Sequence, residues 1–417
     1  MNETDRQTDY DVVIIGGGMV GASLACALGN TPLRIAVIEA APAGAELQPS
    51  FDARTVALAY GSRVIFDSLG LWQAIEALGV TPIKKIHVSD RGHLGSTHLD
   101  CESEGVDALG YVVETRVLGE VLRTAMGKSG NVSVYCPASL EQLVVDDNRA
   151  QLVINRQGQT ETLSTRLLVG ADGGDSQVRQ LLGMRTFRID YGQYAVIANV
   201  ATDRPHRNIA YERFTATGPM ALLPSHDVQD KQDIYALVWT VSESERDSVL
   251  ALDDSGFLHQ LQQRFGQRAG RFVKAGSRHV YPLGWMQSRE HVRPRAAIIG
   301  NAAHTLHPVA GQGFNLGLRD VAVLAQVIVD AVKAGRDPGE LQLLQTYASW
   351  RKRDQLQTAL MTDGIVRVFS SAFPPLALVR NIGLTLFDIL PPLKHTLARH
   401  AMGFIGKLPR PARGLHL

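Results

Sequence analysis

Apolar and polar positions near the start of the chain follow the periods of a strand, a helix and a second strand. Residues 12–15 (VVII) form a short run of β-branched side chains, which is typical of a buried strand in a parallel sheet. Residues 22–28 continue with small and apolar side chains that favour a helix, and the apolar run 35–38 predicts another strand. The pattern therefore predicts a strand–helix–strand unit.

The rest of the chain divides into glycine-bearing segments and a long stretch of alternating strands. Residues 187–281 alternate between strands and polar loops, and this change of texture predicts a β-rich insertion. The polar stretch 155–161 (NRQGQTE) predicts a hairpin turn. The other predicted elements are, in chain order, helices over 62–72, short strands over 83–113, a helix beginning near Thr115, strands over 132–136, 140–145 and 151–154, a helix over 257–265, a strand over 296–299 and a long helix from about Phe314.

Composition and charge narrow the function classes. The chain has 417 residues, enough for two or three domains, and its 42 basic and 41 acidic side chains leave a net charge of +1. This balance favours neither a nucleic-acid binder nor an acidic tail. The three cysteines, Cys26, Cys101 and Cys136, are too widely spaced for a disulfide framework or a metal-ligand pair. We therefore predict no metal site and a cytoplasmic location.

The amino terminus and the hydropathy give no targeting signal. The first ten residues are polar and lack the pattern of a signal peptide, and we find no run of 18 apolar residues that would predict a transmembrane helix.

Glycines occupy the turn after the first predicted strand. Gly16, Gly18 and Gly21 have GxGxxG spacing, in which the first glycine permits a tight turn, the second lets a pyrophosphate approach the backbone, and the third lets the helix pack on the sheet. The helix start offers free N–H groups to the phosphates. Glu39, at the end of the second strand, is placed to accept hydrogen bonds from a ribose diol. Together these features predict a dinucleotide site.

Two later segments repeat the combination of strand, glycines and helix start. In 167–179 (LLVGADGGDSQVR) an apolar strand leads to Asp172 in a glycine-rich turn. In 295–335 a strand, a loop with Gly311 and Gly313, and a long helix follow one another. Such a loop can receive a flat, electron-rich or anionic group.

The three segments together resemble the class A flavoprotein monooxygenases of the para-hydroxybenzoate hydroxylase fold. GGGMVG with Glu39 is similar to their FAD fingerprint, GADGGDSQVR to their DG motif, and IGNAAHTLHPVAGQGFNLGLRD to their GD motif. The resemblance covers about residues 1–350. FDARTVALA and HPVAGQGFNLGLRDV are most similar to the ubiquinone-biosynthesis hydroxylases. Asn301 stands where most of the class has Asp. The 2-polyprenyl-6-methoxyphenol hydroxylases also have Asn at this place, so Asn301 is similar to that group.

The resemblance implies an α/β fold. It consists of a Rossmann-like FAD-binding domain, an inserted β-rich substrate domain and a C-terminal helical segment. The expected boundaries are 1–82, 111–186 and 286–350 for the FAD-binding domain, 83–110 and 187–285 for the substrate domain, and 351–417 for the helical segment.

The resemblance also implies the residues that bind the cofactor. Four glycines, Gly16, Gly17, Gly18 and Gly21, are expected to line the pyrophosphate turn, and Glu39 to bind the ribose of the AMP half. The other implied contacts are Arg54 and Arg116 with the dinucleotide, Asp172 with FAD and the reduced nicotinamide, Asn301 with the ribityl chain, and Gly311, Gly313, Phe314 and Asn315 as backbone donors near flavin N1 and the C2 carbonyl. Pro308 is expected beside the substrate.

The implied reaction uses FAD, NADH or NADPH as electron donor, and molecular oxygen. Hydride transfer to FAD and oxygen addition give a C4a-hydroperoxide, whose terminal oxygen passes to an electron-rich ring. The implied substrate is a polyprenylated phenol of ubiquinone biosynthesis, 2-polyprenyl-6-methoxyphenol. The sequence identifies no catalytic base. His304 and His307 lie in the third segment, but the sequence identifies no partner for either side chain. A packing or hydrogen-bonding role is therefore favoured over a catalytic one.

Two other functions remain open. A flavin-dependent reductase of a prenyl lipid would share the fold without consuming oxygen, whereas a halogenase would carry a WxWxIP motif that we do not find. A non-catalytic, flavin-stabilised subunit of a ubiquinone-synthesis complex would keep the cofactor motifs, and other proteins of that synthesis are the implied partners.

The carboxy-terminal stretch 364–417 combines apolar runs with basic side chains, and Asp388 is its one acid. This combination is typical of peripheral contact with a membrane, here at its inner face. A terminal helical layer packed on the FAD-binding domain explains the pattern equally well.

Overall fold

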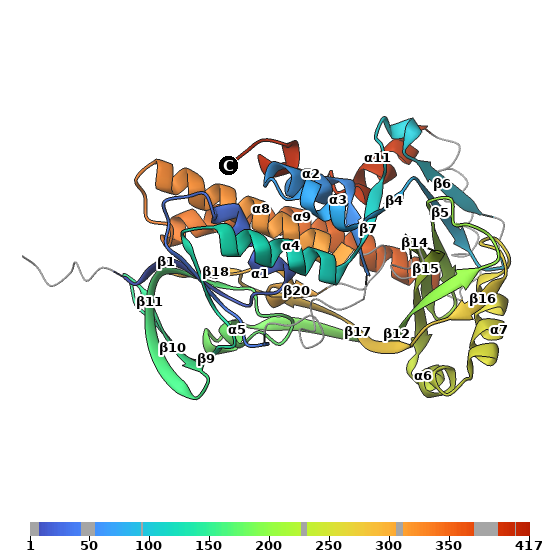
Figure 1. Cartoon of the computed structure of the whole chain (residues 1–417), viewed down its shortest axis with the longest axis horizontal. Helices are drawn as coiled ribbons and strands as arrows, with labels where there is room; N and C mark the ends of the chain where they lie inside the picture. Colours follow the sequence, from blue (N-terminus) through green and yellow to red (C-terminus); the bar gives the residue numbers. More distant parts are fainter. Residues whose placement is uncertain are drawn as a thin grey trace, which may run out of the picture.

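The computed structural model describes residues 8–42, 55–92, 95–226, 232–305, 312–370, 391–404 and 406–417. Two large β-sheets lie towards opposite ends of an elongated molecule, with helices between and beside them (Figure 1).

The first sheet has a parallel centre. Its strands are, in spatial order, β18 (Val292–Arg293), β19 (Ala296–Ile298), β11 (Gln159–Gly170), β1 (Tyr10–Ile15), β2 (Ile35–Ile38) and β8 (Val132–Tyr135), and β10 (Ala150–Arg156) and β9 (Ser139–Val145) continue from β11. The strands from β19 to β8 run parallel, and Val12 of β1 pairs with Leu167 and Ile35 on either side. Such a sheet is buried on both faces, which explains the unbroken apolar runs of β1 and β2.

The two faces of this sheet are covered differently. Val12 and Ile14 pack in a core with helices α1 (Met19–Leu28), α4 (Thr115–Lys128) and α8 (Gln312–Lys333). Val13 and Ile15 point to the other face and pack with β9 and β10. The strand period of two therefore places alternate side chains in separate cores.

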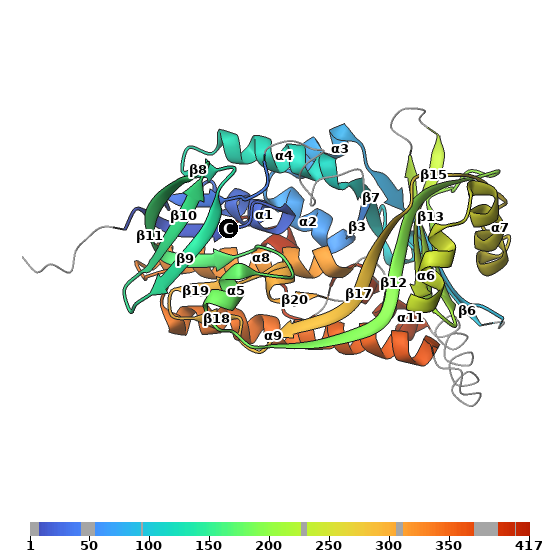
Figure 2. The same cartoon turned by 90° about the horizontal axis from the view of Figure 1, so that it is seen from below.

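The second sheet is mainly antiparallel. Its order is β20 (His304–Thr305), β17 (His279–Ser288), β12 (Thr186–Thr202), β15 (Asp233–Ser242), β14 (Gly218–His226), β13 (Ile209–Thr215), β5 (Lys85–Asp90) and β6 (Ser96–Asp100), and β16 (Phe272–Ala275) pairs with β12. The long strands β12 and β17 reach from β20 and α5 (Gln177–Leu181), beside the first sheet, into the second (Figure 2). Helices α6 (Glu243–Leu250) and α7 (Asp254–Phe265) accompany this sheet, and Val249 and Phe257 share a core with Trp239.

A three-stranded sheet lies between the two large ones. It contains β3 (Thr55–Ala59), β7 (Gly110–Glu114) and β4 (Thr81–Ile83), and β4 and β7 contact β14. The remaining elements are α2 (Tyr60–Ser68), α3 (Trp72–Leu78), α9 (Leu341–Ser370), α11 (Pro391–Ala401) and the short 3-10 turns η1 (Glu102–Glu104), η2 (Gly300–Ala302) and η4 (Pro411–Arg413).

The described part of the carboxy-terminal stretch packs on the body of the protein. Ala398 of α11 and Met402 pack with Leu99 of β6 and with Cys101 and Leu109, which lie between β6 and β7. No helix among the described residues is long and apolar enough to cross a bilayer. Residues 371–390, in the middle of the predicted membrane segment, lie outside the described residues.

The predicted α/β class, the β-rich insertion and the C-terminal helices are confirmed, and the domain boundaries stay a prediction. The hairpin expected at 155–161 is the β10–β11 turn, where Gln157 and Gly158 have φ of 53° and 84°. The elements that were not predicted include α6 and β3. Helix α6 (ESERDSVL) buries only Val249 and so has no apolar period, and β3 is a short apolar run directly before a helix.

Candidate functional site

A cleft of about 720 Å³ lies at the carboxyl ends of the parallel strands. Its walls include residues that directly follow β1, β2 and β11, together with Asn301 of the turn η2 after β19 and the start of α8. Open α/β sheets bind ligands at this edge, next to the strand where the connections change direction. The lining residues used below are Gly16, Gly18, Glu39, Asp172, Asn301, Thr305, Gly313 and Phe314.

The glycine turn after β1 has no room for side chains. Gly16 has a φ of 101°, and a Cβ there would lie 2.5 Å from the carbonyl oxygen of Ala171. A Cβ on Gly21 would lie 1.9 Å from the carbonyl oxygen of Gly16. Gly18 is the N-cap of α1 and supplies no side-chain cap. The first N–H groups of α1 are thus left for a ligand in the cleft, as a phosphate group requires.

Glu39 lies beside this turn, at the end of β2. Its Oε2 accepts a hydrogen bond from the Gly17 N–H at 2.6 Å, and its Oε1 accepts one from the Ala41 N–H at 2.7 Å. The two bonds fix the carboxylate at the rim of the glycine turn. The structure thus brings together the glycines and the acid that the sequence predicted.

The second predicted segment borders the same cleft. Asp172 follows β11 and accepts hydrogen bonds from Ser176 Oγ at 2.6 Å and from the Val178 N–H at 3.0 Å. The buried Arg179 donates to the carbonyl oxygens of Gly174 and Ala302, both at 2.8 Å. Arg179 therefore ties this turn to the third segment.

A buried ionic network holds the third segment, which carries Asn301 and Thr305 at the cleft. Asp320 of α8 is fully buried and accepts hydrogen bonds from the Gly300 N–H at 2.9 Å, from Arg351 Nε at 2.6 Å and from Gln355 Nε2 at 3.1 Å, and its Oδ2 lies 2.7 Å from His304 Nε2. Burial by itself would raise the pKa of Asp320, but the charges and hydrogen bonds of His304 and Arg351 outweigh it and hold that pKa well below its ordinary value. Asp320 therefore stays a carboxylate that fixes the loop.

His304 has a hydrogen-bonding role in this arrangement. It is 1% exposed, it contacts Asp320, and it is not among the residues that line the cleft. His307 lies outside the described residues.

The other predicted site residues are divided among several places. Gly313 and Phe314 line the cleft at the start of α8. Arg116 forms an ion pair with Glu114 and is not a lining residue of the cleft. Arg54, Pro308 and Gly311 lie outside the described residues.

Asn315 points away from the cleft and joins α8 to β3. Its Oδ1 accepts hydrogen bonds from the Ala59 N–H at 2.8 Å and from Ser62 Oγ at 2.7 Å, and its Nδ2 donates to the Ala57 carbonyl oxygen at 2.9 Å. The bonds of this side chain to β3 are not evident from the sequence.

Asn315 also lines a small apolar cavity of about 60 Å³ between the three-stranded sheet and the second large sheet. The apolar lining residues come from β3, β4, β5, β7, β13 and β14 and from Leu109 just before β7, and Ala401 of α11 closes one side. Because Gly313 and Phe314 line the cleft, residues 313–315 separate the two hollows.

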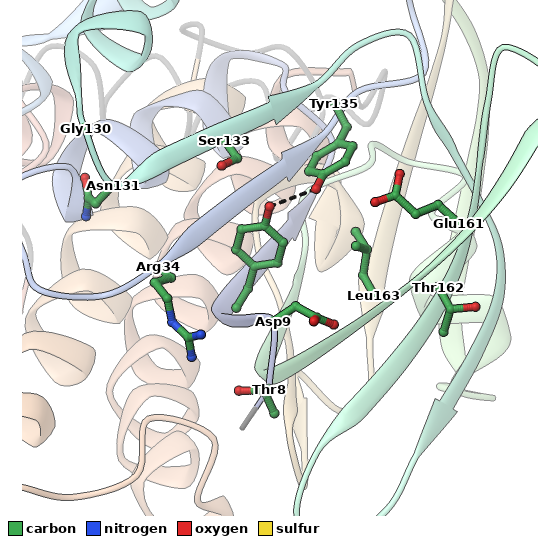
Figure 3. Close-up of a pocket in the computed structure, with 11 residues that line it drawn as sticks. Thr8, Asp9, Arg34, Gly130, Asn131, Ser133, Tyr135, Glu161, Thr162 and Leu163 are labelled. Carbon is green, nitrogen blue, oxygen red and sulfur yellow. Dashed lines mark hydrogen bonds between the residues drawn. The ribbon is translucent and has the colours of Figure 1, made fainter. Parts of the chain in front are cut away.

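Two further features lie elsewhere and take no part in this site. A polar hollow of about 650 Å³ lies beside the amino end of β1 and along β8 and β11 (Figure 3). It contains Arg34 and the hydrogen-bonded pair Tyr10 and Tyr135, whose hydroxyl oxygens are 2.8 Å apart. On the second sheet, Asp233 Oδ1 lies 3.3 Å from His206 Nε2 and 3.1 Å from His226 Nδ1. These contacts pair the groups with one another, and we assign no metal to them.

Comparison with known proteins identifies FAD-binding hydroxylases as relatives of this chain. A family model described as an FAD binding domain matches residues 9–361. The chain is 38% identical over 403 residues to the ubiquinone hydroxylase UbiL of Rhodospirillum rubrum, covering 97% of this chain and 92% of that protein. It is 31% identical over 396 residues to the 3-demethoxyubiquinol 3-hydroxylase of Escherichia coli, covering 94% and 98%. The solved p-nitrophenol 4-monooxygenase of Pseudomonas putida shares the fold, with a TM-score of 0.75 at 18% identity and coverage of 94% and 98%.

The family model and these relatives place the chain among the FAD-dependent aromatic-ring monooxygenases, with NADH or NADPH as electron donor and molecular oxygen as co-substrate, and the fold agrees with this class. Within this class, the chain belongs to the ubiquinone-biosynthesis hydroxylases. The glycine turn fits the cofactor, because a Cβ at Gly16 or Gly21 would clash with the backbone that forms the pyrophosphate cradle.

Proposed function

We propose that this enzyme hydroxylates the aromatic ring of 2-polyprenyl-6-methoxyphenol in ubiquinone biosynthesis. The observation that carries the proposal is that the cleft and an apolar cavity lie on either side of the same short segment of α8. The cleft is lined by glycine turns and Glu39, whereas the adjoining cavity is almost entirely apolar, and residues 313–315 separate them. A prenylated phenol would place its ring on the cavity side, close to a cofactor held in the cleft.

The chain's own residues would hold the cofactor in the following way. Glu39 would accept hydrogen bonds from the ribose of the AMP half, and the turn from Gly16 to Gly18 would contact the pyrophosphate. Asn301 would meet the ribityl chain, with an amide that hydrogen-bonds without adding charge. The remaining family roles are proposed for Gly21, Asp172, Gly313, Phe314 and Asn315, for Arg116, and for Arg54, Pro308 and Gly311, which lie outside the described residues.

Bound FAD would accept hydride from NADH or NADPH and activate oxygen for transfer to the ring. The protein contributes placement and the exclusion of water. The apolar side chains from β3, β4 and β14 around the cavity would keep water from the reacting ring, so that oxygen is transferred rather than released as peroxide.

The test is oxidation of NADH and of NADPH by FAD-loaded protein with short-chain prenylphenols in the presence of ¹⁸O₂. The proposal predicts one labelled oxygen atom in the product. The substrate panel includes 3-demethoxyubiquinol, because one relative is named for that compound. If the label appears in the product of 3-demethoxyubiquinol but not in that of the methoxyphenol, the proposed substrate is wrong and 3-demethoxyubiquinol takes its place.

The same experiment separates the other two functions. A prenyl-lipid reductase would oxidise the nicotinamide and change the substrate without incorporating label. A non-catalytic subunit would bind FAD without oxidising the nicotinamide faster than free flavin does. The Gly21→Ala variant is the matched control, because its glycine turn cannot form in the observed shape.

We also propose that residues 364–417 bring the enzyme to the inner face of the membrane, where a polyprenylated substrate is dissolved, and that proteins of ubiquinone biosynthesis are its partners. Basic side chains beside apolar runs support this contact. The full chain should co-sediment with anionic vesicles and be released by salt, whereas equal binding to zwitterionic vesicles at high salt would argue against the electrostatic part.

A further inference from the structure

One carboxyl group lies in the apolar cavity. Along β13, Ala210 and Glu212 point to the cavity, where Glu212 pairs in register with Ala221 of β14 and Val88 of β5. Tyr211 turns its ring to the opposite face, where it packs edge-on against Phe265. The strand period thus puts a glutamate where its neighbours on the same face are apolar.

Glu212 has no partner among the residues that the structure describes. Its side chain is 8% exposed, and no hydrogen bond or ion pair within the described ranges reaches its carboxyl group. Burial alone raises the pKa of Glu212 to about 8. A buried carboxyl group without a partner costs stability, and such groups occur where a ligand supplies the missing hydrogen bond.

The surroundings leave Glu212 as the main titrating group of the cavity. The other polar residues in its lining are Asn315, a neutral amide bonded to β3, and Tyr211, whose ring packs on the opposite face of the sheet. Tyr211 stays neutral, because burial raises the pKa of its phenol. Asp90 of β5 shares the same face of the sheet, opposite Phe214 and two positions further along β13.

We propose that this cavity is the subsite for the ring hydroxyl of the phenol, and that the Glu212 carboxylate receives the hydroxyl proton during hydroxylation. This inference rests on the proposed function. The cavity of about 60 Å³ has room for a hydroxyl group and the adjacent edge of a ring. The phenol O–H bond breaks, a carboxyl O–H bond forms on Glu212, and the electron pair stays on the phenolate oxygen. The oxygen transfer itself uses the O₂ and the reduced nicotinamide of the proposed reaction.

The environment suits Glu212 to this proton transfer. A phenol has a pKa near 10 and an ordinary glutamate near 4.3, so an ordinary glutamate is a poor base for it. A carboxyl group with a pKa of about 8 is a much better match, and general bases work best when their pKa lies near the operating pH. The phenolate that results directs electron density to the ring carbon that takes the oxygen.

The first arm of the test measures labelled product in single turnovers from pH 6 to pH 9.5 with 2-prenyl-6-methoxyphenol. The rate at which the wild type forms labelled product should rise with pH through an apparent pKa near 8. In Glu212→Gln this rate should be about 10²- to 10⁴-fold lower and should not rise with pH. Glu212→Asp should recover part of the rate. Glu120→Gln, on the exposed face of α4, is the matched control and should keep the wild-type profile. Glu212→Gln within threefold of wild type, with the same profile, would overturn the inference.

The second arm measures binding without turnover. FAD-loaded protein, kept oxidised, is titrated with the phenol and with its methyl ether, and the flavin absorbance reports binding. The wild type should bind the phenol about 10- to 100-fold more tightly, since the ether leaves the carboxyl group unpaired, and Glu212→Leu should lose this preference. An equal preference in wild type and Glu212→Leu would refute the subsite. Should the wild type incorporate no label with any substrate, the proposed function fails, and this arm still decides the role of Glu212.

Discussion

Glu212 has no partner among the described residues, and this leads to a prediction about folding that needs no substrate. Replacing the carboxyl group by an amide of the same shape, in Glu212→Gln, removes a buried group that becomes charged as the pH rises. The wild type should therefore lose stability with increasing pH relative to this variant, even though the variant removes no hydrogen bond or ion pair within the described residues.

The size and sign follow from the pKa. Burial raises the pKa of Glu212 from 4.5 in the unfolded chain to about 8 in the folded protein. The unfolded chain then releases its proton at lower pH than the folded protein, so the glutamate costs nothing below about pH 4.5, costs progressively more up to about pH 8, and reaches a constant penalty above it. At 1.36 kcal/mol for each factor of ten in proton affinity, that penalty is about 3–5 kcal/mol.

The assay is urea unfolding of FAD-saturated protein at pH 5, 7 and 9, followed by tryptophan fluorescence. Wild type and Glu212→Gln should have free energies of unfolding within about 1 kcal/mol at pH 5, and the variant should be more stable by about 3–5 kcal/mol at pH 9. The exposed control Glu120→Gln should follow the wild type at every pH. A difference between wild type and Glu212→Gln that stays constant from pH 5 to pH 9 would refute the burial of an unpaired carboxyl group.

Three other variants test the cofactor cleft. Gly21→Ala should raise the dissociation constant for FAD at least 100-fold and lower stability by about 1–3 kcal/mol, because the new Cβ would lie 1.9 Å from the Gly16 carbonyl oxygen; Gly127→Ala, in open space on α4, should bind FAD normally. Asp320→Ala should cost about 3–5 kcal/mol in urea unfolding, because it leaves the buried Arg351 and its neighbour His304 without their carboxylate partner. A loss below about 1 kcal/mol would contradict the network. Glu39→Gln should weaken FAD binding about tenfold in a fluorescence titration, while the melting temperature of the apoprotein stays within a few degrees of the wild type. An unchanged affinity would show that Glu39 does not bind the ribose.

The residues that the structure brings to one cleft could be predicted together because their sequence signals are local. The apolar run of β1, the glycines after it and Glu39 lie within 30 residues, and each has a steric or hydrogen-bonding reason for its place. Parallel strands bring their carboxyl ends to one edge of the sheet, so the turn at Asp172 and the loop with Asn301 had to meet the first glycine turn once their strands joined the same sheet.

Residues whose roles depend on distant partners were missed. Asp320 and Arg351 stand in helical sequences of ordinary appearance, and only the packing of α8 on α9 brings them together at 2.6 Å. Asn315 belongs to a predicted cofactor motif, yet its side chain bonds to β3 more than 250 positions earlier in the chain. Glu212 lies in an alternating strand, where a glutamate normally faces solvent, and the sheet that covers it is formed by other parts of the sequence.

The most direct test of the account is a crystal structure of the protein with FAD. We predict one FAD in the cleft, with the ribose of its AMP half hydrogen-bonded to Glu39, its pyrophosphate on the turn from Gly16 to Gly18, and its ring beside Gly313 and Phe314, on the side of the cavity that contains Glu212. An FAD bound elsewhere, or a flavin ring that lies away from Gly313 and Phe314, would contradict it.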